Sequence, residues 1–103
     1  MAAPSRRTDL LLSVQRALVG HVGASLCGGC AEVQDELIVL TWYVRPEIPE
    51  DEREDLLVAG TEVIADYPAP YRIDDRFVEI ADPPSPLPTA GEWVFLRREA
   101  TTT

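Results

Sequence analysis

The chain has 103 residues, of which 46% are hydrophobic and 26% are charged, and its net charge is −9. These values are typical of one folded globular domain and argue against a disordered chain, and no apolar run is long enough to cross a membrane. The negative charge argues against direct nucleic-acid binding, because such binding requires a basic surface.

Apolar periodicity in the first half of the chain predicts a helix followed by a β-hairpin. A capping residue at Thr8 or Asp9 begins a helix that runs to about Val19. Two strands follow, over residues 24–33 and 37–44, joined by a short polar turn. In the second strand, LIVLTWYV, alternate residues face opposite sides of the sheet. One side carries Ile38, Leu40, Trp42 and Val44, and the other carries Val39, Thr41, Tyr43 and Arg45.

The second half of the chain predicts a helix and two more strands. Pro49 suits the first turn of a helix, in which Gly60 indicates close contact with the sheet. Strands are expected at about 76–80 and 92–99, separated by an extended, proline-rich connector. The order is α-β-β-α-β-β. We therefore predict an α+β fold with two helices packed on one face of a mostly antiparallel sheet of three or four strands.

The domain boundaries follow from these elements. We expect residues 1–7 to form a disordered N-terminus, residues 8–99 to form a single domain, and residues 100–103 to form a tail. The apolar stretch near the start is interrupted at helical spacing, so it predicts an amphipathic helix and not a signal peptide. We expect a cytoplasmic protein, whose thiols a reducing compartment would keep free.

Acidic residues are concentrated in one segment of the chain. Residues 46–82 hold twelve of the 18 acidic residues and three arginines, so this segment carries the whole net charge of −9. Such a field favours a basic protein partner through electrostatic steering, although solubility alone is an open alternative. Tyrosines near these acids are amphipathic and suit an interface, or else the core. The predicted partner-binding residues are Glu47, Glu50, Asp51, Glu54, Asp55, Tyr67, Tyr71, Asp74 and Asp75.

The motif CGGC contains Cys27 and Cys30, which are the only cysteines of the chain. No helix follows the pair, and the nearby charges are acidic, so a low-pKa redox site is disfavoured. In an extended segment the two side chains point to opposite faces, which suits packing. A turn at Gly28-Gly29 would bring them together, so zinc binding with His21 as a further ligand stays an open alternative.

Other catalytic signatures are missing from the sequence. It contains no nucleophile elbow, no phosphate-binding loop and no calcium-binding loop. The pair Asp74-Asp75 suits a turn before a strand more than a metal site. We therefore expect a non-enzymatic binding protein without a cofactor.

Three stretches carry a resemblance to a known group of proteins: the acidic second helix, the segment TEVIADYP with YRIDDRFVEI, and the closing EWVFLRRE. The chain resembles small bacterial α/β immunity proteins of contact-dependent inhibition and other polymorphic toxin systems. The resemblance implies one cognate toxin as partner, often a nuclease, whose basic cleft the acidic face would block. The alternatives are a structural or assembly subunit that pairs through a sheet edge, and a small zinc- or thiol-dependent protein.

Overall fold

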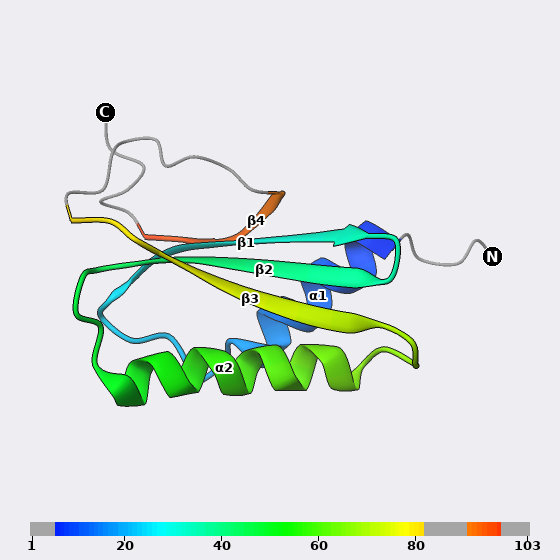
Figure 1. The fold of residues 1–103 in the computed structure, drawn as a ribbon, viewed down its shortest axis with the longest axis horizontal. Helices are drawn as coiled ribbons and strands as arrows, with labels where there is room; N and C mark the ends of the chain where they lie inside the picture. Colours follow the sequence, from blue (N-terminus) through cyan, green and yellow to red (C-terminus); the bar gives the residue numbers. More distant parts are fainter. Residues whose placement is uncertain (1–5, 82–90, 98–103) are drawn as a thin grey trace.

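The computed structural model describes residues 6–81 and 91–97, which form two helices and a four-stranded sheet (Figure 1). The predicted α+β class and the order α-β-β-α-β-β are confirmed. Neither helix in this part of the chain is long and apolar enough to span a membrane. The elements are α1 (Arg6–Ala17), β1 (Leu26–Gln34), β2 (Leu37–Val44), α2 (Glu50–Ala65), β3 (Arg72–Glu79) and β4 (Glu92–Leu96).

The sheet has the strand order β3-β2-β1-β4. Strand β1 is antiparallel to both of its neighbours, β2 and β4, whereas β2 and β3 are parallel. A parallel pair needs a crossover connection, and α2 provides it between β2 and β3. Both helices contribute to the core on one face of the sheet (Figure 1).

Strand β2 lies inside the sheet and is buried on both of its faces. Ile38, Leu40, Trp42 and Val44 pack in the core beneath the helices, as the alternation predicts. The opposite face is also closed, because Val39 is 1% exposed and Tyr43 4% exposed. A nearly continuous apolar run is typical of strands buried on both faces.

Several predicted boundaries need correction. Helix α1 begins at Arg6, so residues 6 and 7 belong to it and not to a disordered terminus; residues 1–5 and the predicted tail lie outside the described residues. Strand β3 begins at Arg72, four residues before the predicted start, because the whole stretch pairs with β2 from Leu37 onward. Strand β4 ends at Leu96, and residues 98 and 99 of the predicted strand are not described.

Helix α2 packs on the sheet at Gly60, as the sequence indicates. Its buried residues are Leu56, Ala59, Gly60 and Val63. A Cβ atom at Gly60 would lie 2.6 Å from an Asp75 carboxylate oxygen on β3, so only a glycine fits there without a shift. This contact fixes which face of α2 is turned away from the sheet.

Candidate partner-binding site

The acidic residues of α2 fall into two groups. The first group faces α1 and the loop that follows it. Glu52 accepts hydrogen bonds from the Ser25 backbone N–H at 2.9 Å and from the Ser25 hydroxyl at 3.3 Å. His21 lies between two carboxylates: its Nδ1 is 3.5 Å from Asp55 and its Nε2 is 3.8 Å from Glu62. The Glu52 hydrogen bonds tie the loop after α1 to α2, whereas Asp55 and Glu62 lie beside the His21 imidazole, whose Nδ1 makes no hydrogen bond within the described residues.

The second group points into solvent from the first turns of α2. Glu50, Asp51 and Glu54 are exposed and have no hydrogen-bond or ion-pair partner within residues 6–81 and 91–97. The arginine within this stretch, Arg53, is turned toward the sheet, where its guanidinium lies 4.2 Å from the centre of the Phe77 ring. The outward face at the start of α2 is therefore purely acidic, and its carboxylates are available to an external cation.

Glu47 lies just before α2 and extends this acidic surface. The side chain is exposed, and its backbone has a positive φ of 59°. The Glu47 backbone N–H donates a hydrogen bond to a Glu79 carboxylate oxygen at 3.3 Å, which connects the turn to the end of β3. We use the name outward acidic face for Glu47, Glu50, Asp51 and Glu54.

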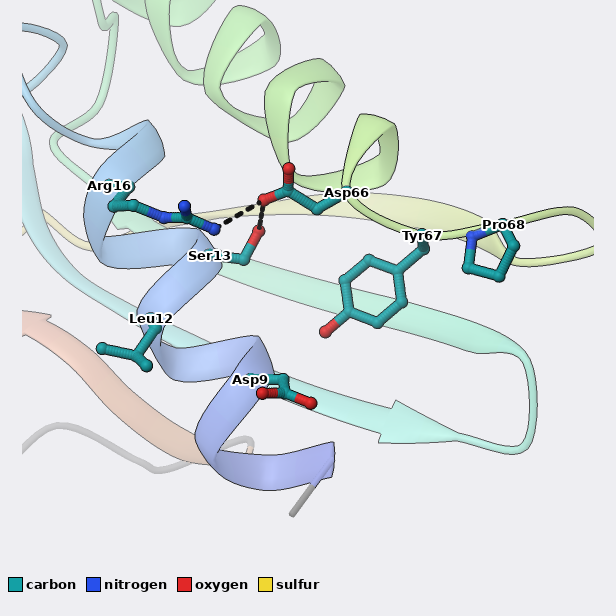
Figure 2. A pocket seen from close by; sticks show the side chains of 7 residues that line it. All are labelled: Asp9, Leu12, Ser13, Arg16, Asp66, Tyr67 and Pro68. Carbon is teal, nitrogen blue, oxygen red and sulfur yellow. Dashed lines mark hydrogen bonds and ion pairs between the residues drawn. The ribbon is translucent and has the colours of Figure 1, made fainter. Parts of the chain in front are cut away.

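Tyr67 and Tyr71 lie at the other end of α2, away from the outward acidic face. Their rings stack, with centroids 5.0 Å apart and an angle of 28° between the planes. Tyr67 also lines a cavity of about 590 Å³ between α1 and the end of α2 (Figure 2). The lining residues are Asp9, Leu12, Ser13, Arg16, Asp66, Tyr67 and Pro68.

At the wall of this cavity, the Asp66 carboxylate connects the end of α2 to α1. Asp66 accepts a hydrogen bond from the Ser13 hydroxyl at 2.6 Å and another from Arg16 Nη2 at 3.1 Å (Figure 2). No local sequence motif signals this cavity, because it depends on how the two helices cross. Since Asp66 is paired inside the chain, the cavity is a helix–helix junction more than a cation site.

The Tyr67 hydroxyl is buried and makes no hydrogen bond within the described part of the chain. Burial raises the pKa of Tyr67, and the nearby Asp9 carboxylate raises it further. An unpaired buried hydroxyl lowers stability. We therefore expect Tyr67→Phe to leave the free energy of unfolding in urea unchanged or to raise it by up to about 1 kcal/mol.

Ser13→Ala is the contrasting variant for this prediction. Ser13 is 2% exposed and donates to Asp66, so its replacement should lower the free energy of unfolding by about 1 kcal/mol. A Tyr67→Phe variant that loses as much stability as Ser13→Ala would show that the Tyr67 hydroxyl has a partner.

Asp74 and Asp75 are adjacent in β3 and have different hydrogen-bond partners. Asp74 accepts from Arg76 Nε at 2.8 Å and forms an ion pair with it. Asp75 lies under α2 and accepts from the indole N–H of buried Trp42 at 3.0 Å. The two residues therefore do not act as a carboxylate pair, and Asp75 faces the interior and not a partner.

The charge of Asp75 makes stability depend on pH. Burial raises the pKa of Asp75, the hydrogen bond from Trp42 lowers it, and the neighbouring Asp74 raises it. Because the pKa is higher in the folded than in the unfolded chain, the folded state holds the proton more tightly. The contribution of Asp75 to stability is thus complete below the ordinary carboxyl pKa of about 3.9 and is lost as pH rises through the raised pKa.

Asp75→Asn should remove the cost of burying a charged carboxylate while keeping an acceptor for Trp42. We expect the variant to have a higher free energy of unfolding than the wild type at pH 7. The difference should vanish below about pH 3.9, where the wild-type carboxyl is protonated in both states. Urea unfolding at a series of pH values measures this. A stability difference that stays constant over the pH series would contradict the raised pKa of Asp75.

Cys27 and Cys30 lie in one buried cluster with Tyr43, on the sheet face opposite the helices. The prediction that they point to opposite faces is wrong, because irregularities in the register of β1 at Leu26/Gly28 and Gly29/Cys30 change the alternation. Both cysteine side chains are buried, and within the described residues neither forms a disulfide bond. Among the described residues, no group of three or more histidine, cysteine or acidic side chains is placed to hold a metal ion. His21 faces α2 carboxylates instead.

The nine predicted binding residues are thus not brought together on one surface. Glu47, Glu50, Asp51 and Glu54 are grouped, whereas Asp55 is engaged by His21. The two tyrosines lie at the opposite end of α2, and the β3 aspartates bond within the chain. The chain is thus a small acidic α+β protein whose described part carries a helix face of unpaired carboxylates.

Comparison with known families specifies this class further. The model of the MafI2 immunity protein family matches residues 7–99, so the chain belongs to this family of bacterial immunity proteins. The resemblance noted in the sequence is confirmed. Membership supports a toxin-neutralising role, suggests a non-enzymatic inhibitor and implies a cognate toxin as partner. Comparison with curated proteins gave no match.

Proposed function

We propose that the chain neutralises its toxin by binding a basic surface of that toxin through the outward acidic face. The observation that carries this proposal is the set of exposed carboxylates at the start of α2, Glu50, Asp51 and Glu54, which have no partner within the described residues. Carboxylates elsewhere on α2 are engaged by Ser25 and His21. The outward carboxylates differ from these in having no partner within the described residues, so they are open to direct contact with the toxin.

The proposed toxin surface is the substrate cleft of a nuclease. A nuclease cleft must be basic because it binds a phosphate backbone. Several carboxylates on one rigid helix match such a cleft in charge, and they would speed association by steering the two proteins together. Occupation of the cleft would exclude the nucleic acid, so inhibition would not require a chemical step by this chain.

The test combines capture with growth rescue. The tagged chain is used at low salt to capture its partner from the native organism, and the partner is released by a salt ramp and identified by mass spectrometry. The captured protein is then expressed in a host with and without the chain. We expect a single basic protein that arrests growth alone and is harmless when co-expressed. A partner that binds but whose toxicity the chain does not relieve would contradict the proposal.

A further inference from the structure

Two exposed apolar side chains follow the carboxylates on the outer surface of α2. Leu57 is 40% exposed and Val58 45% exposed. They come one turn after Glu54, and Thr61 and Ala65 continue the same surface toward the end of the helix. Glu50 and Ala65 are about 22 Å apart along the axis at 1.5 Å per residue. The outer surface therefore changes from acidic to apolar along its length.

The outer surface of α2 forms a strip from Glu50 to Ala65, and the residues on both of its flanks contact other parts of the chain. On one side Asp55 and Glu62 face His21. On the other side Arg53 lies over Phe77 of β3. The small side chains of Thr61 and Ala65 leave Leu57 and Val58 as the largest apolar groups on the outer surface. The strip is therefore a defined surface and not a scatter of single residues.

We infer that Leu57 and Val58 form the apolar core of the toxin interface, bordered on one side by Glu50, Asp51 and Glu54. This inference rests on the proposed function. Protein interfaces place their apolar anchors centrally and their charged residues at the rim, where the charges orient the partner. The fitting toxin surface is a shallow apolar depression with arginine or lysine side chains along one edge.

Charge favours a basic toxin over a second copy of the chain as the partner that covers this strip. A second copy of the chain would bring together two molecules that each carry a net charge of −9, and like charges across an interface repel. Leu12 on α1 is more exposed, at 54%, but Asp9 and Arg16 near it carry opposite charges. The strip on α2 thus combines exposed apolar side chains with adjacent unpaired carboxylates, which matches a basic protein.

Dissociation kinetics test the inference. The probe is the toxin domain that the wild-type chain neutralises, carrying an inactivating substitution in its own active site. Leu57→Ala with Val58→Ala should raise the dissociation rate by about 10- to 100-fold and leave the association rate and its salt dependence unchanged. Leu12→Ala is the matched control and should bind as the wild type does. Thermal unfolding is measured for each variant, and Val58→Ala alone provides the test if the double variant fails to fold.

Two results would overturn the inference. One is a dissociation rate unchanged in the folded double or single variant. The other is an equal loss of affinity in the Leu12→Ala control. In either case, continued neutralisation by the wild type and its loss on charge reversal at Glu50 and Asp51 would leave the proposed function intact. A wild-type chain that neutralises no toxin would instead contradict the proposed function itself.

Discussion

Replacement of both Glu50 and Asp51 by arginine is expected to slow association with the cognate toxin by at least about tenfold at low ionic strength. The two carboxylates are exposed and have no partner within the described residues, so their field acts on the approaching toxin. Reversal turns attraction into repulsion at the same positions. Rapid-mixing kinetics measure the effect directly. Unchanged binding by this variant would show that the outward acidic face is not the interface.

The control for this prediction separates position from net charge. Glu54→Arg and Glu36→Arg change the net charge by the same amount. Glu36 is exposed in the turn between β1 and β2, at the opposite end of the molecule from the start of α2 (Figure 1). We expect only Glu54→Arg to slow association strongly. Arginine near a helix N-terminus opposes the helix dipole by about 0.3–1 kcal/mol, so thermal unfolding is recorded for each variant.

Gly60→Ala is expected to lower the free energy of unfolding by about 2 kcal/mol, although alanine favours a helix by about 1 kcal/mol over glycine. The new Cβ would lie 2.6 Å from a carboxylate oxygen of Asp75. Asp75 would have to move away from the indole N–H of Trp42, a fully buried residue. A buried donor left without an acceptor costs about 1–3 kcal/mol, which exceeds the gain in helix propensity.

A double-mutant cycle identifies the cause. In the Asp75→Ala background no carboxylate opposes the new Cβ, so Gly60→Ala should cost much less there than in the wild type. Urea unfolding gives the free energies of the four proteins. If Gly60→Ala stabilised the wild-type chain, that result would contradict the close approach of α2 to Asp75 on β3.

The parts of the fold that follow from local periodicity were predicted well from the sequence. The alternation in β2 placed Ile38, Leu40, Trp42 and Val44 on one face, because side chains along a strand have a period of two. Acidic residues after Pro49 marked the start of α2, because they complement the helix N-terminus. Gly60 signalled close packing, because a glycine is costly in a helix without such a reason.

The parts that depend on non-local pairing could not be predicted. Nothing in the segment before Arg76 signals that β2 accepts a parallel partner from Arg72 onward. Register irregularities in β1 place Cys27 and Cys30 in one cluster, and a bulge of this kind has no reliable sequence signature beyond Gly28-Gly29. Tertiary pairing overrides the turn preference of Asp74-Asp75 in the first case and the regular alternation of a strand in the second.

The sequence predicted which segment holds the candidate site, but not which of its residues share one surface. Composition located the acidic segment, yet it could not separate Glu50 and Glu54, which face solvent, from Asp55 and Asp75, which have partners in the chain. That separation depends on the rotation of α2 about its axis. The rotation is set by packing of Gly60 and its neighbours on the sheet, which is known only once the fold is known.

The most direct test of the central claim is site-specific photo-crosslinking to the cognate toxin. A photoreactive amino acid replaces Glu54 in one variant and Glu36 in another, and each is irradiated with the inactivated toxin and analysed by mass spectrometry. We predict a crosslink from position 54 to a toxin segment that contains arginine or lysine, and none from position 36. A crosslink from position 36 together with none from position 54 would contradict the assignment of the interface to α2.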